Sequence, residues 1–432
     1  MPAPLTFGSQ AVETTSAPQA VTLTNSGNAT LTITSITITG TNSGDFTQTN
    51  ACGSSLKPNA SCTIDVTFTP TATGTRSAQV SISDNASGSP QNVSLTGTGA
   101  STPLVDFASG QKYLGNFPGQ LYTDPSTNVD SNTVPAQHDT AGKNIALQVV
   151  PLDASGIPSS AGKIGVVGIG MSNWTDELCL ALRTQGPCAP GTFLAQAAAN
   201  SQVNQTTLVL VDCAQSGHIA ADWIDNSDSS YSTCITERLP LWNITRDQVE
   251  VVLWKDANPD PSVSMTSSTT CAYQPLPIPS SNPDVCSYEE YLGLMARFLK
   301  TPFPNVKQLF VHSRVYAGYA TVPLNPEPFA YEYGFATKWF VNAQIAQDAT
   351  GKVDPVAGDL NYTTAPWIAW GPYWWAAGTT PCNNCQIPGQ IWVQSDYQSD
   401  GTHPSGAGAT KVGNNLMDYF LKSPYSPWFR AP

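Results

Sequence analysis

Four runs made almost wholly of apolar residues are the sequence feature that most constrains the fold. Runs of this kind suit strands that are buried on both faces of a parallel sheet. They lie at 164–169, 208–211, 249–254 and 309–311. Between and after them, apolar residues recur every three or four positions, at 285–300, 333–349 and 405–422. Strands that alternate with helices predict a doubly wound α/β/α domain of three layers around a parallel sheet.

The first hundred residues have a different pattern, in which apolar and small polar residues alternate. The alternating segments are 21–24, 31–39, 62–68, 78–83 and 93–97, with turn sequences such as Asn25-Ser26-Gly27-Asn28 between them. Short strands of period two predict an antiparallel β-sandwich. A chain of 432 residues is also too long for one ordinary core. We therefore expect two domains, 1–100 and 104–432.

The sandwich segment resembles a known group of modules. The matching stretches are Leu5–Gly8, Leu23–Gly27, Cys62–Pro70 and Leu95–Gly99. They are similar to the immunoglobulin-like modules of bacterial surface proteins and of the ASPM/SPD-2/hydin group. The segment contains no histidine and only scattered carboxylates, so we interpret it as a spacer or binding module.

The ten cysteines fall into near neighbours along the chain. The neighbours are Cys52/Cys62, Cys179/Cys188, Cys213/Cys234, Cys271/Cys286 and Cys382/Cys385. This spacing predicts short-loop disulfides and an oxidising compartment. The Cys382-Asn383-Asn384-Cys385 stretch alone also allows a redox or metal pair. It has no second pair or histidine nearby, which favours a structural bridge.

Charge and composition narrow the partners and the location. The net charge of −13 opposes binding to nucleic acid or to an anionic membrane. No apolar run reaches 18 residues, so no membrane-spanning helix is expected. Only 11% of the residues are charged, and the opening Met1–Pro4 lacks the features of an export signal. We expect a secreted or cell-surface protein of bacterial origin whose export signal has been removed; the oligomeric state stays open.

Two distant segments supply the groups needed for nucleophilic acyl transfer. Ser172 follows the first apolar run, and Asp400 precedes His403 by three residues near the C-terminus. A serine hydroxyl must lose its proton as it attacks, so it needs an imidazole base, and the imidazole needs a carboxylate to fix its tautomer. One turn can present both the carboxylate and the imidazole.

Four blocks in this order resemble the SGNH (GDSL-type) hydrolase superfamily. The blocks are Gly170-Met171-Ser172-Asn173, Ser216-Gly217, Lys255-Asp256-Ala257-Asn258 and Asp400-Gly401-Thr402-His403-Pro404-Ser405. Met171 replaces the usual Asp of the first block, and the asparagine block is loose. The resemblance implies a flavodoxin-like α/β/α fold for the larger domain.

The resemblance also implies roles for the residues in these blocks. Ser172 would be the nucleophile, His403 the base and Asp400 its partner. The oxyanion would be held by the backbone amides of Ser172 and Gly217 and by the Asn258 side chain. The predicted protein is a secreted serine esterase that acts on acyl, above all acetyl, esters of carbohydrates or other extracellular substrates. No metal or organic cofactor is implied.

Further residues are expected to contact the substrate. Asn173 adjoins the nucleophile, and Trp370 and Trp374 belong to an aromatic stretch at 366–375. Flat rings can stack on sugars, although they can equally pack in the interior. Asn173 also begins an Asn-Trp-Thr sequon, which we expect to be unglycosylated.

Two other functions stay open at this point. The first is a non-catalytic surface protein that binds carbohydrate or protein on the same scaffold, which Met171 and the loose asparagine block favour. The second is a thiol oxidoreductase built around Cys382 and Cys385. Loss of esterase turnover in Ser172→Ala would separate the predicted enzyme from both.

Overall fold

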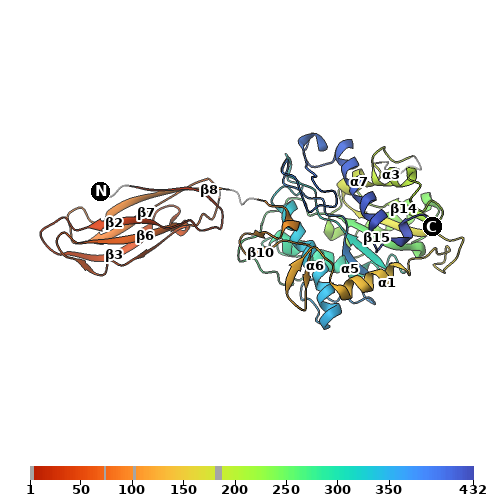
Figure 1. Cartoon of the computed structure of the whole chain (residues 1–432), viewed down its shortest axis with the longest axis horizontal. Helices are drawn as coiled ribbons and strands as arrows, with labels where there is room; N and C mark the ends of the chain where they lie inside the picture. The colour runs from red at the N-terminus through yellow and green to blue at the C-terminus, as the bar shows by residue number, and fades with distance from the viewer. Residues whose placement is uncertain (1–3, 73, 101–103, 181–186) are drawn as a thin grey trace. The chain divides into compact units, whose positions relative to one another are not determined.

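A computed structural model describes residues 4–72, 74–100, 104–180 and 187–432. The chain divides into two compact units (Figure 1). The smaller unit holds the described residues through Ala100 together with Leu114–Phe117, and the larger holds Leu104–Tyr113 and Pro118–Pro432. The two units are described separately.

The smaller unit is a β-sandwich. Its sheets have the strand orders β1-β8-β7-β3-β5 and β2-β6-β4. The strands are β1 Leu5–Ala11, β2 Gln19–Thr24, β3 Leu31–Thr39, β4 Phe46–Asn50, β5 Ser55–Leu56, β6 Ser61–Phe68, β7 Gly74–Asp84 and β8 Gln91–Ala100. Inward-facing aromatic and branched side chains fill the space between the sheets, with Phe46 stacked on Phe68. One pairing differs from the antiparallel expectation, because β1 runs parallel to β8.

A five-stranded parallel sheet forms the centre of the larger unit. Its strands are β13 Ile164–Gly170, β14 Leu208–Asp212, β15 Val249–Lys255, β16 Gln308–Val311 and β17 Trp367–Trp370. They lie in the order β14-β13-β15-β16-β17, and every neighbouring pair is parallel. This is the 2-1-3-4-5 order of flavodoxin-like sheets. The four predicted strands are confirmed. The sheet has a fifth strand, β17, which lies within the aromatic stretch at 366–375 and was not predicted.

Helices cover both faces of this sheet (Figure 1). They are α1 Ala136–Ala146, α2 Ser172–Leu178, α3 Phe193–Ala199, α4 Ser230–Thr233, α5 Asp284–Phe298, α6 Phe329–Thr350 and α7 Gly406–Lys422. Helices α2 and α3 pack against α7, whereas α5 packs against α6. The helices of the first crossover, α2 and α3, therefore share one layer with α7, the helix that follows the last strand, whereas α5 and α6 pack together in another.

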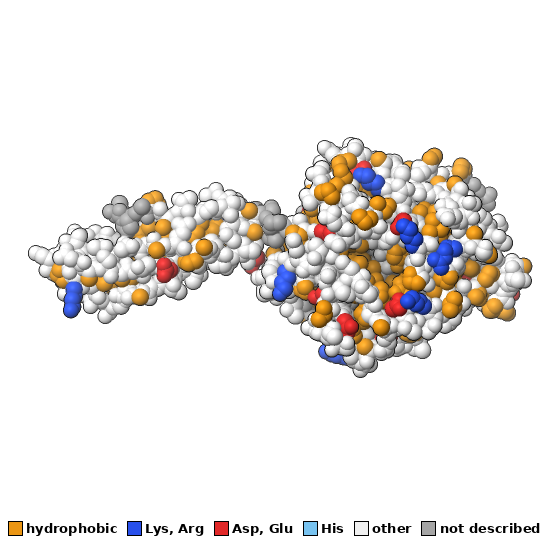
Figure 2. All heavy atoms as spheres, viewed as in Figure 1, with side chains coloured by type: hydrophobic (Ala, Val, Ile, Leu, Met, Phe, Trp, Pro, Cys, Tyr) orange, Lys and Arg blue, Asp and Glu red, His pale blue; other side chains and the backbone are white. Residues whose placement is uncertain are grey.

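Short pairings and disulfides complete the unit. Two small two-stranded sheets precede α1: β9 Lys112–Tyr113 with β10 Phe117–Pro118, and the antiparallel pair β11 Tyr122–Asp124 with β12 Val129–Ser131. Five disulfides join the neighbouring cysteines of the whole chain, so the expected short loops are present. Within the described segments, no helix is both long and apolar enough to cross a bilayer. Figure 2 shows basic side chains dispersed over the visible face, several beside an acidic one.

Candidate active site

Ser172 stands where β13 ends and α2 begins. β13 is buried along its whole length, and only Met171 separates it from the helix. Gly170 has a φ of +143°, and a Cβ there would lie 1.9 Å from the carbonyl oxygen of Lys255 on β15. Glycine alone permits this approach. The close packing of β13 and β15 therefore fixes Ser172 just beyond the carboxyl edge of the sheet.

Three side chains form a continuous chain of hydrogen bonds. Oγ of Ser172 lies 2.8 Å from Nε2 of His403. Nδ1 of the same ring lies 2.5 Å from Oδ2 of Asp400. These distances are those of a nucleophile, a base and an orienting carboxylate. The structure thus brings together the three residues that the sequence singles out, which are 231 positions apart at the widest.

The carboxyl of Asp400 is held so that one oxygen faces the imidazole. Its Oδ1 accepts hydrogen bonds from the backbone amides of Thr402 and His403, at 2.9 and 3.0 Å. Burial alone would raise the pKa of Asp400, but the hydrogen bonds from the His403 ring and from these amides outweigh it and keep the pKa below its usual value. An ionised Asp400 accepts the Nδ1 proton, which leaves Nε2 as the acceptor facing Ser172.

The turn that carries Asp400 and His403 is locked on both sides. Gly401 has a φ of +66°, and a Cβ there would lie 1.8 Å from the carbonyl oxygen of Tyr319. The buried amide of Asn173 donates a 2.7 Å hydrogen bond to the carbonyl oxygen of Thr402. Asn173 lines the cavity beside Ser172 as well. Sequence reasoning placed it near the substrate and missed that its amide holds the base loop.

Ser172 and His403 open onto a cavity of about 530 Å³. Its walls combine amide and apolar side chains from loops that follow β13, β14 and β15. The lining residues are Met171, Ser172, Asn173, Asp176, Ser216, Gly217, His218, Ile219, Ala257, Asn258, Pro259, Leu324, Asn325, Gln398 and His403. Asp400 lies behind the imidazole, as its hydrogen bond requires.

Gly217 and Asn258 reach this cavity from neighbouring strands. Gly217 has a φ of +84°, with open space where a Cβ would be. Its loop is joined to the end of β13, because the amide of Gln215 donates to the carbonyl oxygen of Gly170. Asn258 follows β15, and its Oδ1 is buried without a hydrogen-bond partner among the described residues. The two predicted oxyanion donors therefore share one cavity with Ser172.

Asp176 contributes a carboxyl to the cavity wall. Burial raises its pKa to about 6, the charge of His403 acts in the opposite direction, and Glu177 and Asp400 raise it further. It therefore changes charge near neutral pH, next to the candidate base. The sequence shows it only as an acidic residue early in a helix.

A buried ion pair joins α2, the helix that begins at Ser172, to the end of β15. Nζ of Lys255 lies 2.5 Å from Oε2 of Glu177, and both side chains are fully buried. Burial raises the pKa of Glu177 and lowers that of Lys255 to about 8, while each charge favours the other. The buried guanidinium of Arg314 lies nearby and contacts Sδ of Met171. Nothing in the order of the residues indicates that Glu177 and Lys255, 78 positions apart, meet.

Two predicted substrate contacts lie elsewhere. Trp370 and Trp374 are 1% and 0% exposed, and neither lines the Ser172 cavity. The Trp370 ring donates to the carbonyl oxygen of Leu121, and the Trp374 ring donates to that of Ser313. Both rings are structural parts of the interior, since Trp370 is the last residue of β17 and the Trp374 ring stacks on that of His312.

Asn325 is a cavity residue that sequence reasoning did not single out. It is 1% exposed, and neither polar atom of its amide has a hydrogen-bond partner among the described residues. Cys382 and Cys385 form a disulfide and do not line this cavity. In the described part of the chain, no group of three or more His, Cys, Asp or Glu side chains is arranged to hold a metal ion.

Comparison with known proteins gives one family match. The family model described as Cep192 domain 4 matches residues 2–100, which is the β-sandwich. No curated protein matches the chain.

Comparison with solved structures gives distant likenesses. A carbohydrate esterase family 2 enzyme with a carbohydrate binding domain, from Corynascus thermopiles (Myceliophthora fergusii), is 12% identical, covers 94% of this chain and 93% of its own, and has a TM-score of 0.30. A family two carbohydrate esterase from Cellvibrio japonicus is 9% identical, with 95% and 99% covered and a TM-score of 0.30. The secreted serine protease VesC from Vibrio cholerae is 17% identical over 24% of each chain, with a TM-score of 0.20. This chain thus spans about a quarter of VesC. Likenesses this weak carry no conclusion about chemistry.

Proposed function

We propose that the larger unit is a serine esterase of the SGNH type that hydrolyses acyl esters, above all acetyl esters, of carbohydrates or other extracellular substrates. The observation that supports this most is the hydrogen-bond chain from Ser172 through His403 to Asp400 at the wall of an open cavity. A nucleophile, a base and an orienting group in that order are what acyl transfer through a covalent intermediate requires.

The proposed reaction has two halves. Oγ of Ser172 attacks the ester carbonyl carbon while Nε2 of His403 takes the hydroxyl proton. His403 then gives that proton to the leaving alcohol oxygen, and an acyl-enzyme remains. Water attacks the acyl-enzyme with His403 again as the base, which releases the acid and restores Ser172. Asp400 stabilises the imidazolium that forms in each half.

The negative charge on the carbonyl oxygen needs donors in the same cavity. We assign these to the backbone amides of Ser172 and Gly217 and to the side-chain amide of Asn258. Gly217 suits the role because a residue without a Cβ leaves its amide accessible to the substrate. Each donor of this kind contributes about 10²–10³ in rate.

The cavity and the disulfides support an extracellular, hydroxyl-rich substrate. Asn173, Asn325 and Gln398 place three amide side chains around the opening, and amides both donate to and accept from hydroxyl groups. Five disulfides support an oxidising location. We propose that the protein is secreted or displayed at a bacterial cell surface, with the β-sandwich as its spacer or binding module.

The decisive experiment measures turnover of p-nitrophenyl acetate and of acetylated xylan. Ser172→Ala is expected to abolish both reactions. Ser216→Ala is the matched control, since this hydroxyl lines the same cavity from the β14 side. Phenylmethylsulfonyl fluoride should label Ser172 alone, which mass spectrometry of the peptides can locate. Full turnover by Ser172→Ala, or no turnover by the unchanged chain, would reject the esterase and leave a non-catalytic binding protein.

A further inference from the structure

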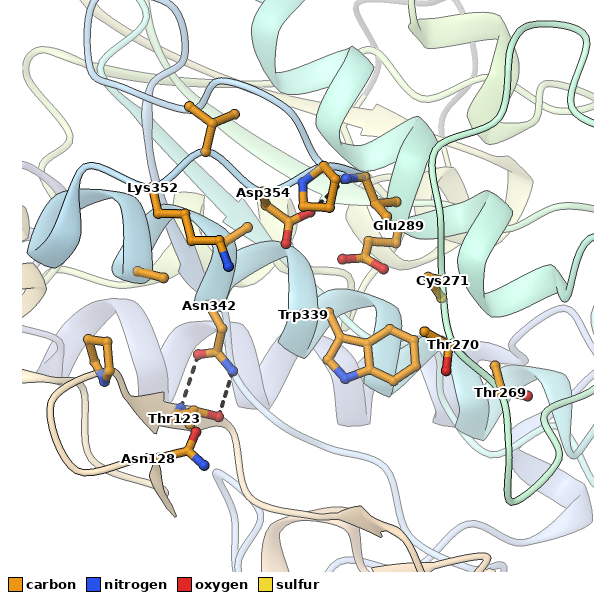
Figure 3. A pocket seen from close by; sticks show the side chains of 16 residues that line it. Thr123, Asn128, Thr269, Thr270, Cys271, Glu289, Trp339, Asn342, Lys352 and Asp354 are labelled. Carbon is orange, nitrogen blue, oxygen red and sulfur yellow. Dashed lines mark hydrogen bonds between the residues drawn. The ribbon is translucent and has the colours of Figure 1, made fainter.

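A second cavity of about 490 Å³ lies in the larger unit and shares no lining residue with the Ser172 cavity. We call it the Trp339 cavity; its walls come from α5, α6 and the loops at 123–128, 269–271 and 352–356. Its size falls within the range of small-molecule sites. Figure 3 shows the Trp339 ring on one side, with the carboxyls of Glu289 and Asp354 turned toward one another above it.

Glu289 is the most unusual group in this cavity. The residue is only 4% exposed, and it lines the cavity wall. Burial raises its pKa well above the usual value, and the neighbouring charges of Asp354 and Glu290 raise it further. A raised pKa favours the protonated carboxyl, which has one O–H to donate.

The remaining wall groups are held in place. Oδ1 of Asp354 accepts from the backbone amides of Val356 and Ala357. The Asn342 side chain exchanges two hydrogen bonds of 3.0 Å with Thr123, which ties α6 to β11 (Figure 3). A disulfide between Cys271 and Cys286 joins the opposite rim to α5. The cavity thus has walls that need little rearrangement on binding.

The chemistry of these walls selects one ligand class. A flat indole buries the apolar face of a sugar ring. A protonated Glu289 would donate and the Asp354 carboxyl would accept, which together match hydroxyl groups that do both. The positive charge of Lys352 in the cavity lining would repel a cationic ligand, and the carboxyls of Glu289 and Asp354 disfavour an anionic one. We infer that the Trp339 cavity binds a neutral saccharide segment at a site separate from Ser172. This inference goes beyond the esterase proposal and does not depend on it.

The test is isothermal titration calorimetry of the full chain with xylohexaose, cellohexaose and mannohexaose. At least one should bind, and Trp339→Ala should weaken that binding by at least about tenfold. Asp354→Asn keeps Oδ1 for the two backbone amides and should also weaken binding. Trp242→Ala removes an indole outside the Trp339 cavity, 39% exposed, and should leave both binding and esterase turnover unchanged. Circular dichroism confirms that each variant is folded.

Repeating the titrations in Ser172→Ala separates this inference from the proposed function. Saccharide binding that persists there, and is lost in Trp339→Ala, supports the second site whether or not the chain is an esterase. A folded Trp339→Ala or Asp354→Asn that binds as the unchanged chain does would overturn the inference. So would binding of tetramethylammonium in place of every oligosaccharide, or no saccharide binding at about 10 mM, a concentration that detects even millimolar affinity.

Discussion

The side-chain amide of Asn173 donates a 2.7 Å hydrogen bond to the carbonyl oxygen of Thr402, which joins the residue after Ser172 to the residue before His403. The first segment belongs to α2 and the second to the loop before α7. The distance between the candidate nucleophile and the candidate base is therefore fixed by a contact that takes no part in the proposed chemistry.

Asn173→Ala should lower kcat by about 10²-fold and change KM little. Without the amide the His403 turn is free to shift, and a shift of about 1 Å has an effect of this size. Steady-state kinetics on p-nitrophenyl acetate provide the measurement. Asn325→Ala is the control, because this amide lines the cavity but makes no hydrogen bond to the His403 loop within the described residues. An unchanged kcat in Asn173→Ala would show that the bond is dispensable.

Asn258→Ala should lower kcat by about 10²–10³-fold if its amide stabilises the oxyanion. The loss should appear in kcat rather than KM, since the donor acts on charge that develops in the transition state. Asn325→Ala tests a neighbouring amide of the same cavity that has no proposed part in the reaction. A larger loss in Asn325→Ala than in Asn258→Ala would reassign the donor.

Asp176 should make the folded state sensitive to pH. Its pKa rises from 3.8 to about 6 on folding, so the folded state binds its proton more tightly than the unfolded state does. The stability from this residue is present below about pH 4 and is lost as the pH rises through 6. Asp176→Asn should therefore gain about 1 kcal/mol relative to the unchanged chain between pH 4 and pH 7, after screening of a partly exposed group. Urea unfolding at the two pH values measures this gain, and an equal difference at both would contradict it.

Lys255→Met should destabilise the larger unit by about 3–5 kcal/mol, because it leaves Glu177 buried without its partner. The double variant Lys255→Met/Glu177→Gln should recover most of that loss. Lys422→Met, which breaks an exposed pair with Asp418, should change stability by less than about 1 kcal/mol. Thermal unfolding of the unchanged chain and the three variants measures these differences. A double variant that is no more stable than Lys255→Met would refute the pairing.

The sequence predicts most of the central sheet because most of its strands are buried along their length. Such strands appear in the sequence as runs made almost wholly of apolar residues. β17 escapes this rule, since four residues with two tryptophans look the same in a strand and in a binding loop. For the same reason the sequence could not assign Trp370 and Trp374 to the interior. The Ser172 and Asp400/His403 segments were recognisable from local order. The pairing of Glu177 with Lys255, 78 positions apart, and the unpartnered amide of Asn325 depend on packing, which residue order alone does not specify.

The ten cysteines of this protein pair two by two in order of sequence, the first with the second, the third with the fourth and so on. The two cysteines of a pair are 3 to 21 residues apart. A polypeptide that emerges N-terminus first into an oxidant presents every pair complete before the following pair arrives. Oxidation in order of appearance then yields the native set directly, without reshuffling by an isomerase, and the crosslinks can close while the central sheet is still unassembled.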